Sequence, residues 1–460
     1  MVVGDLATEV DVVVLGAGAG GCAAAVRAAQ LGKEVVIVNS GGLGGTFLHE
    51  GGVGCQALLT AAERAWRLPH LVTMGVMVEG VKVDWAQMQR WKDGIVSRLS
   101  NGVQKRLEEH NVHIVKGKGW FIKPNEVRVE KQYGSERFIF EHAIIAVGAD
   151  AAPLPGLPFD GQRILSPSQA LRLEKLPKEL TIVASDDAPG SRGEIAAELA
   201  TLFAKLGVVV RLLIPAGQRL LNQFDPLAGR QVQTQLRHLG VKIKRNVKDL
   251  ATNPAVEHAP IVVLCAELTP RTEQLALDVA RVTTDQEGYI LVNDRMQSHN
   301  PAIYAVGDVT GGPPLATLAI KQGQIAAETI AGLPTQYAPQ AVPRVAWTHP
   351  QIASVGLTTE QAQVLGYQPI SHRYPLAANA RALTLNAPTG TILTVAEQTS
   401  QLLLGVTIIA PQANELITQA ALAIEMGATL TDLAETLPPH PSLAHALQQS
   451  AEALLLHEAR

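Results

Sequence analysis

Residues 11–40 read DVVVLGAGAGGCAAAVRAAQLGKEVVIVNS, and this stretch decides the fold. An apolar run, a glycine turn, a helix of small residues and a second apolar run predict a strand–helix–strand unit. Gly16, Gly18 and Gly21 form the pattern G-x-G-x-x-G at the turn. In such units the first glycine permits the tight turn, the second lets a pyrophosphate approach the backbone, and the third lets helix and strand pack closely. The stretch therefore predicts a dinucleotide site at the start of the helix.

Asn39 ends the second predicted strand, where an acidic residue usually binds the ribose hydroxyls of the nucleotide. Because an Asn amide can still donate and accept hydrogen bonds, the position indicates a weakened ribose contact rather than a lost one. An Asn that merely ends a strand is an equal alternative.

The same plan returns more loosely from Thr181, in TIVASDDAPGSRGEIAAELATLFAKLGVVVRLLI. A stretch rich in proline and glycine, residues 149–161, separates the two units and suits a linker. From Arg344 onward, strand-like runs followed by helical stretches predict an α+β domain with an antiparallel sheet. The predicted fold is therefore α/β, with two Rossmann-like dinucleotide-binding domains and a C-terminal α+β domain.

Composition and charge exclude several classes of protein. The 460 residues include 38 basic and 42 acidic ones, giving a net charge of −4, and no long run of one sign indicates a nucleic-acid partner. No apolar run reaches the roughly 18 residues of a membrane span, and the N-terminus lacks the features of a signal peptide. The three cysteines are odd in number and far apart, which argues against a disulfide-stapled secreted fold. We therefore expect a cytoplasmic protein, with no metal site.

A series of motifs follows in a characteristic order along nearly the whole chain. They are LGAGAGG, GGTFLHEGGVGCQALL, VKGKGWF, AIIAVGADAAPLPG, IYAVGDVTGGPPLA, THPQIASVGLT, PLAANARAL, NELITQAALAIEMGA and LPPHPSLAHAL. Together they resemble the flavin-containing pyridine nucleotide-disulfide oxidoreductases, and among these the dihydrolipoamide dehydrogenases. The resemblance implies a homodimer whose chain has an FAD-binding domain at 1–150 and 276–343, an inserted NAD-binding-like domain at 151–275 and a dimerisation domain at 344–460.

The resemblance also implies which residues bind FAD. Asp308 matches the aspartate that holds the ribityl chain of the flavin, and Gln56 stands where the family has a lysine beside the flavin's reactive edge. Other matching positions are glycines that let the backbone approach the cofactor. The predicted cofactor-binding set is Gly16, Gly18, Gly21, Asn39, Gly45, Thr46, Gln56, Gly119, Gly148, Asp308 and Ala316.

The loop at 44–56 departs from the family where the chemistry takes place. The family loop reads Gly-Gly-Thr-Cys-Leu-Asn-Val-Gly-Cys-Ile-Pro-Ser-Lys, and its two cysteines form the disulfide that passes electrons between flavin and dithiol. Aligned without a gap, the cysteine positions carry Phe47 and Gly52. Because exchange needs an attacking thiolate and a resolving partner, we predict that disulfide reductase activity is absent. Cys55 is a candidate reactive thiol, and the alternative is a small buried apolar residue.

The C-terminal motif is altered as well. His440-Pro441-Ser442 resembles the family's His-Pro-Thr, whose histidine acts as general acid–base on the thiol of the partner subunit. The supporting glutamate of the family falls at His445. Since a neutral imidazole orients and activates a histidine less well than a carboxylate does, we expect a structural or vestigial role for this pair.

The second nucleotide unit shows the same kind of change. Counting back from Glu198, the turn expected to read G-x-G-x-x-G is Ser191-Arg192-Gly193-Glu194-Ile195-Ala196, after an additional loop at 186–187. Glu194 adds negative charge at this turn, and Glu267 replaces a family glycine. The second strand ends in LLIPAGQ, without an acidic residue for the NAD ribose. We therefore predict that NAD(H) is not bound efficiently.

These departures leave three classes of function. The first, which we favour, is an FAD-binding homodimer without disulfide reductase activity, with an interaction or regulatory role on a protein partner such as a component of a 2-oxoacid dehydrogenase complex. The second is a flavin oxidoreductase that works without a disulfide, in which open space left by Gly52 and Gly54 admits a quinone or another small acceptor. The third is a structural homodimer without flavin, which the Asn39 position motivates.

Overall fold

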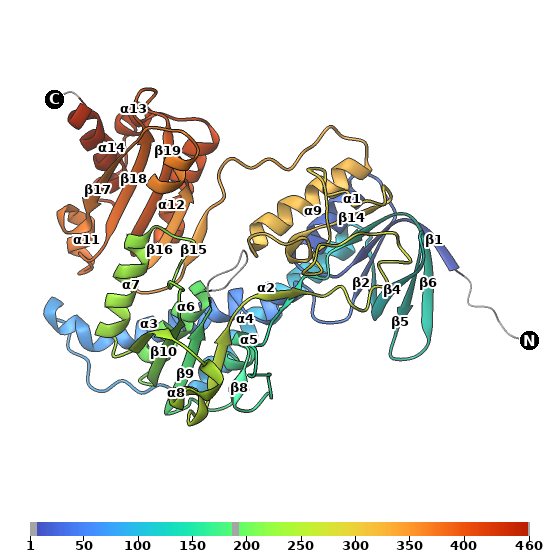
Figure 1. Ribbon diagram of the computed structural model, residues 1–460, viewed down its shortest axis with the longest axis horizontal. Helices are drawn as coiled ribbons and strands as arrows, with labels where there is room; N and C mark the ends of the chain where they lie inside the picture. The colour runs from blue at the N-terminus through green and yellow to red at the C-terminus, as the bar shows by residue number, and fades with distance from the viewer. Residues whose placement is uncertain (1–6, 186–192, 459–460) are drawn as a thin grey trace, which may run out of the picture. The chain divides into compact units, whose positions relative to one another are not determined.

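The computed structural model describes residues 7–185 and 193–458. They form two compact units, which are described separately. The first comprises residues 7–176 and 266–338, and the second comprises residues 177–185, 193–265 and 339–458. Both contain a parallel sheet with helices packed on it, so the α/β class predicted from the sequence is confirmed (Figure 1).

The first unit is built on a seven-stranded sheet, in which β1 lies between β2 and β6. β1, β2, β3, β6 and β14 run parallel, while β5 and β4 extend the sheet beyond β6 in antiparallel register. A short two-stranded sheet of β7 and β13 accompanies it. The strands are β1 (Ala7–Leu15), β2 (Val35–Asn39), β3 (His113–Lys116), β4 (Lys118–Lys123), β5 (Glu126–Glu130), β6 (Ser135–Ile145), β7 (Ala149–Ala151), β8 (Ile164–Leu165), β13 (Leu268–Pro270) and β14 (Ile303–Ala305).

Small residues let two helices cross closely on one face of this sheet (Figure 1). These are α1 (Ala19–Gln30) and α9 (Ala316–Ile330). A Cβ atom at Gly323 would collide with the carbonyl oxygen of Gly20, so neither helix tolerates a larger residue at the crossing. Because both faces of the strands are covered, β1 is buried along Val12–Leu15 without alternation, as parallel strands usually are.

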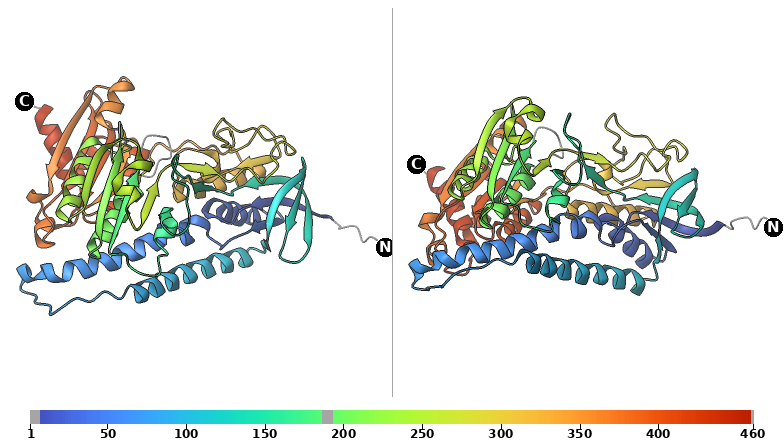
Figure 2. Two further views of the ribbon diagram at one scale, coloured as in Figure 1. Left: turned by 60° about the horizontal axis from the view of Figure 1, so that its bottom comes forward. Right: turned by 90° about the horizontal axis from the view of Figure 1, so that it is seen from below.

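Two long helices of the first unit run side by side (Figure 2). Residues 152–176 also belong to this unit, because the indole N–H of Trp85 donates to the carbonyl of Leu173 and the amide of Gln89 donates to that of Leu171. The first compact unit therefore extends to residue 176, and the expected domain bounds remain predictions. The helices here are α2 (Gly45–His49), α3 (Gly52–Arg67), η1 (Leu68–Met74), α4 (Trp85–Glu109), α5 (Pro167–Ala170) and η3 (Gly307–Thr310).

The second unit begins with the second predicted strand–helix–strand motif. β10 pairs in parallel with β9, as the pattern from Thr181 predicts, and the order of these strands is β11, β10, β9, β12. The elements are β9 (Glu179–Ala184), α6 (Gly193–Lys205), β10 (Val209–Pro215), α7 (Pro226–His238), β11 (Lys242–Val247), η2 (Leu250–Thr252), α8 (Pro254–Glu257) and β12 (Val262–Cys265).

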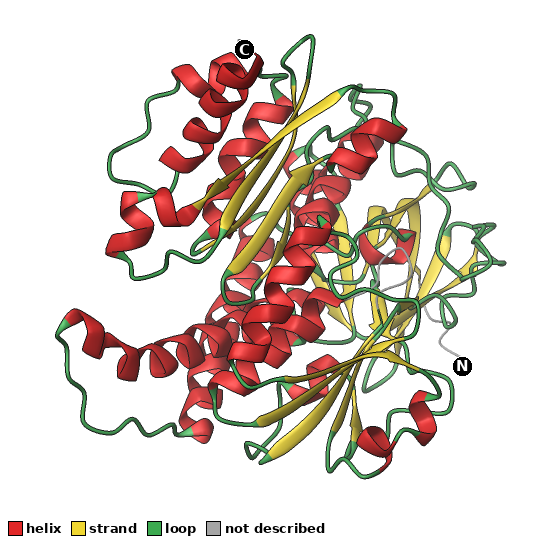
Figure 3. Cartoon of the chain, turned by 60° about the vertical axis from the view of Figure 1, so that its left-hand side comes forward, coloured by secondary structure: helices red, strands yellow, loops and turns green. Residues whose placement is uncertain are grey.

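The rest of this unit is the predicted α+β region, an antiparallel sheet in the order β15, β16, β19, β18, β17. Its inner face forms one core with α12, α13 and α14 (Figure 3). The elements are β15 (Arg344–Ala346), β16 (Gln351–Gly356), α10 (Thr359–Val364), β17 (Pro369–Pro375), η4 (Leu376–Ala378), α11 (Ala380–Thr384), β18 (Thr391–Glu397), β19 (Leu403–Ala410), α12 (Ala413–Glu425), α13 (Leu430–Glu435) and α14 (His445–Glu458).

Within the described ranges, none of the helices combines the length and the apolar character that crossing a membrane requires.

Candidate cofactor site

The predicted cofactor residues meet at one edge of the first sheet. Gly16 follows β1, Gly148 follows β6, Asn39 ends β2, and Asp308 lies in η3 after β14. These strands are parallel neighbours, so their carboxyl ends lie at the same edge. Open parallel sheets bind ligands outside the carboxyl ends of their strands, where the order reverses. β1 is that reversal point here, since its neighbours β2 and β6 lie on opposite sides of it.

The geometry of the glycine turn fits the three roles inferred from its sequence. Gly16 has a φ of +105°, and a Cβ atom there would collide with the carbonyl oxygen of Ala146. A Cβ atom at Gly21 would collide with the oxygen of Gly16. At Gly18, by contrast, the nearest atom to a Cβ would be 4.0 Å away. The first and third glycines are therefore required by packing, while the second leaves room for a ligand.

The start of α1 suits a phosphate. Gly18 caps the helix without a side-chain hydrogen bond, and the first turn contains no acidic residue. The N–H groups of this turn and the positive end of the helix dipole are therefore available to an anion. The loop before α2 closes over the turn, because Gly44 donates its N–H to Ala17 O at 2.8 Å and Gly45 leaves no room for a side chain beside Gly18.

Asn39 is engaged with its own loop. Its amide nitrogen donates to Gly41 O at 2.6 Å, and its amide oxygen accepts from Gly41 N at 3.4 Å. A ribose contact would have to share or replace these bonds. Both sequence interpretations of this residue, a weakened ribose contact and a strand-ending Asn, remain compatible with this geometry.

The other implied cofactor positions differ in their surroundings. Gly148 has a φ of +74° and open space where a Cβ would point, whereas a Cβ at Gly119 would lie 2.9 Å from Leu15 Cδ2. Packing inside the sheet is therefore enough to explain a glycine at position 119, without a cofactor. Ala316 is the first residue of α9, a helix that also begins without a capping side chain or an early acidic residue.

Arg271 is a residue of this site that sequence reasoning missed. Its Nη2 atom lies 2.5 Å from Asp150 Oδ1 and 3.6 Å from Glu50 Oε2, and its backbone N–H donates to Gly148 O. The hydrogen bond to Asp150 raises the pKa of Arg271, with further support from Glu50 and Asp308. Arg271 therefore connects the loop after α2 to the edge that holds Asp308. A signal existed, since an Arg stands where the family segment has Asn.

Phe47 and Gly52, which the resemblance matches to the two cysteines of the family loop, are packed against each other. A Cβ atom at Gly52 would lie 2.5 Å from Phe47 Cδ2, so the Phe47 ring fills the space of a side chain at position 52. At Gly54 a Cβ would meet Lys92 Cδ at 3.5 Å. The expectation of open space is therefore wrong at Gly52, whereas Gly54 has only ordinary contacts there. The opening lies at Gly51, where a Cβ would meet nothing within 4 Å.

Cys55 lies one turn into α3 with 5% of its surface exposed. Reactive thiols are usually partly exposed and stabilised as thiolates, so burial favours the packing role over the reactive one. Thr46 in α2 and Gln56 in α3, both half-buried, flank this part of the loop. The chain's three cysteines are all thiols in the structure.

His440 and His445 are brought together as the motif implies. Their Nδ1 atoms are 3.3 Å apart, and the rings meet edge to face with centroids separated by 5.1 Å. Only one of the two nitrogens can donate in that contact, because the other must accept. A second imidazole therefore occupies the place that the family gives to a carboxylate.

The predicted NAD turn lies partly outside the described residues, which exclude 186–192. Of the parts described, Glu194 is in the first turn of α6, and Glu198 is buried and accepts from Trp347 N at 2.9 Å. The backbone oxygen of Glu267 accepts from Ala152 N.

The fold and the edge site define a class: oxidoreductases that join two dinucleotide folds to a dimerisation domain. Residues 10–323 match the family described as pyridine nucleotide-disulphide oxidoreductase, and residues 342–451 match the dimerisation domain of that family. The chain belongs to the pyridine nucleotide-disulphide oxidoreductase family.

Relatives of full length support the assignment. The chain is 37% identical to dihydrolipoyl dehydrogenase 2 of Haloarcula marismortui, with 98% of each chain covered. It is 35% identical to dihydrolipoyl dehydrogenase of Geobacillus stearothermophilus, over 99% of this chain and 98% of that one. Among solved structures, LpdA from Mycobacterium tuberculosis has the same fold, with a TM-score of 0.88, 24% identity and coverage of 97% of this chain and 99% of that one.

Proposed function

We propose that this chain is a homodimeric, FAD-binding relative of the dihydrolipoyl dehydrogenases that does not catalyse dithiol–disulfide exchange. The observation that carries the proposal is the packing of Phe47 on Gly52. Neither position supplies sulfur, and the ring fills the space that a cysteine side chain at 52 would need. An exchange reaction requires a nucleophilic thiolate and a second sulfur within bonding reach.

The edge site supports FAD as the cofactor. The open face of Gly18 and the uncapped start of α1 would hold the pyrophosphate, and Asp308 would hold the ribityl chain. Bound FAD would supply one- and two-electron redox chemistry. Arg271 and Glu50 would then fix the loop beside the cofactor.

The remaining parts of the proposal concern partners and location. The match of residues 342–451 to a dimerisation domain supports a homodimer. For the interaction or regulatory role we keep a component of a 2-oxoacid dehydrogenase complex as the proposed partner, as the resemblance implies. Glu194 places a negative charge in the first turn of α6, where the NAD(H) pyrophosphate would bind, and this disfavours efficient NAD(H) binding. We propose a cytoplasmic location, because all three cysteines are thiols and the cytoplasm keeps thiols reduced.

The test uses the full-length protein purified with its cofactor. We expect a flavin spectrum, FAD released on denaturation, and no dihydrolipoamide-dependent reduction of NAD⁺ at the rates of dihydrolipoyl dehydrogenases. Turnover at those rates would refute the proposal.

A second candidate is a flavin oxidoreductase that works without a disulfide. It is favoured by the open space at Gly51, which lies in the loop itself. Anaerobic titration with NADH, NADPH and candidate donors should bleach the flavin absorbance if this function is present. A colourless protein without FAD would instead support the structural homodimer that Asn39 motivates.

A further inference from the structure

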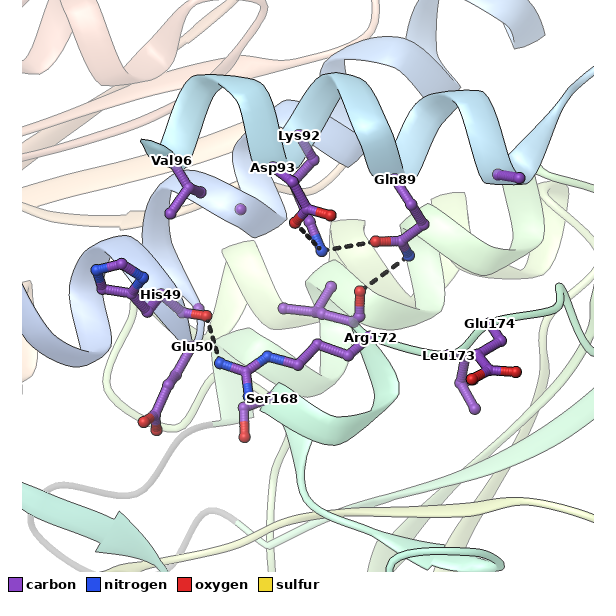
Figure 4. A pocket seen from close by; sticks show the side chains of 14 residues that line it. His49, Glu50, Gln89, Lys92, Asp93, Val96, Ser168, Arg172, Leu173 and Glu174 are labelled. Atoms are coloured by element: carbon purple, nitrogen blue, oxygen red, sulfur yellow. Dashed lines mark hydrogen bonds and ion pairs between the residues drawn. The ribbon is translucent and has the colours of Figure 1, made fainter. Parts of the chain in front are cut away.

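A cavity of about 480 Å³ opens beside the loop, entirely within the first unit. Its walls are the loop residues from His49 to Gly54, one face of α4, and residues 168–174 (Figure 4). The volume is in the range of small-molecule sites. The cavity is separate from the glycine turn at the carboxyl edge of the sheet, since none of the turn's residues line it.

The loop wall of this cavity is built from the positions at which the chain departs from the family. His49, Glu50 and Gly54 line it, and the family loop has Asn, Val and Pro at these places. His49 is held by a contact between its Nε2 atom and Leu43 O at 2.9 Å. Of the four loop residues that line the cavity, only Gly51 matches the family loop.

A buried lysine lines the cavity from α4. Lys92 is only 7% exposed, and its stem lies against Gly54. Its ammonium donates to Gln89 Oε1 at 2.6 Å and pairs with Asp93 Oδ1 at 3.1 Å. An ammonium has three N–H donors, so one remains for a ligand.

An arginine faces the lysine from the opposite wall. Figure 4 shows the Arg172 side chain running toward the loop, where its Nη2 atom donates to His49 O at 2.7 Å. A guanidinium has five N–H groups, so the others can bind an acceptor. The adjoining start of α3, at Gly51 and Gly52, has no capping side chain and no acidic residue in its first turn.

Three carboxylates also line the cavity, and two of them already have cationic partners. Asp93 is engaged by Lys92, and Glu50 lies 3.6 Å from the guanidinium of Arg271. Glu174, the remaining one, is exposed at the far end beyond Leu173 (Figure 4).

We propose that this cavity binds a small oxyanion, a carboxylate or a phosphate group, between Lys92 and Arg172 at the start of α3. Such a group accepts charge-assisted hydrogen bonds from both cations. The ligand would link α3, α4 and the 168–174 segment, and would stiffen the loop that carries Phe47 and Gly52. This inference is independent of the proposed function, because none of the predicted cofactor-binding residues lines the cavity.

The experiment is calorimetric titration of the full-length protein with inorganic phosphate and, separately, with malonate, at constant ionic strength set by chloride. We expect saturable binding of at least one anion, and the preferred one identifies the source of the oxyanion. Lys92→Met keeps the stem over Gly54 and should weaken binding by about tenfold or more. Arg172→Gln, at an exposed position, should do the same.

The matched control is Lys105→Met, on the same helix and 76% exposed at its side chain, which should leave binding unchanged. Melting temperatures without anion report whether each variant is folded. No saturable heat with either anion overturns the proposal, and so does undiminished binding by folded Arg172→Gln. Equal weakening by Lys105→Met would reduce the effect to general charge and overturn it as well.

Discussion

The glycine turn and the loop that follows it lie against each other, but the turn matches the family pattern and the loop does not. At the turn, Gly16 and Gly21 are each held in place by a backbone oxygen that excludes any side chain. In the loop, a Cβ at Gly52 would meet both the Phe47 ring, at 2.5 Å from Cδ2, and the Phe47 backbone oxygen, at 2.8 Å. A mutation can remove the ring but not the backbone oxygen, so only part of the obstruction at Gly52 can be relieved.

This difference separates constraint from adaptation. The turn is fixed by the fold, so its pattern persists wherever the strand–helix–strand unit persists. The loop is fixed by mutual packing, so a change at one of its positions requires a change at the other. Substitutions in the turn and in the loop should therefore have different effects.

The largest effect is expected from Gly21→Ala. The new Cβ would collide with Gly16 O, and overpacking of this kind costs about 1–3 kcal/mol or more in unfolding free energy. FAD should be lost with it, which absorbance at the flavin band would report together with thermal melting. Gly18→Ala should instead remain folded and bind FAD less well, because the space there is open.

Gly102→Ala on α4 is the control, since nothing lies within 4 Å of its Cβ. Alanine should stabilise this helix by roughly 0.5–1 kcal/mol. If Gly21→Ala melts like the wild type and keeps its flavin, the turn is not fixed by packing.

The next effect is expected in the loop, from Gly52→Cys. Alone it should destabilise the protein by about 1–3 kcal/mol, because its Cβ would lie 2.5 Å from the Phe47 ring. Combined with Phe47→Ala, the part of that cost caused by the ring should disappear, while the part caused by the Phe47 backbone oxygen at 2.8 Å should remain. Urea unfolding of the two single variants and the double variant gives the coupling energy. Additive effects would show that the two positions are independent, contrary to the proposed adaptation.

A smaller effect is expected from Arg271→Gln, which removes the link between the loop and the sheet edge. The guanidinium is partly exposed, so the loss of its pairs with Asp150 and Glu50 should cost about 0.5–1 kcal/mol. Hydrogen exchange should quicken at residues 45–54 and remain unchanged in β1. Glu50→Gln should reproduce the faster exchange; if neither variant changes the loop, Arg271 does not position it.

The sequence was enough to predict the parallel sheet and the edge site, because glycine spacing and apolar runs have local physical causes. It was not enough for contacts that join distant segments. Glu50 and Arg271 are far apart in the chain, and no periodicity relates them. The prediction of open space at Gly52 was wrong for the same reason. Whether a position without a side chain stays open depends on which neighbouring side chain packs over it, and here that is Phe47.

The smallest effect is expected in the pH dependence of stability, from Cys22 in the first turn of α1. Cys22 donates its thiol to Ala17 O at 3.2 Å, and burial raises its pKa to about 11. The ordinary value for an unfolded thiol is about 8.5, so between these pH values the unfolded chain has lost a proton that the folded chain retains. The free energy of unfolding should therefore fall as pH rises through that window. Denaturant unfolding of wild type and Cys22→Ala across pH 8–11 tests this, since the variant should lack that part of the decline. A parallel decline in both proteins would show that Cys22 does not titrate differently in the folded state.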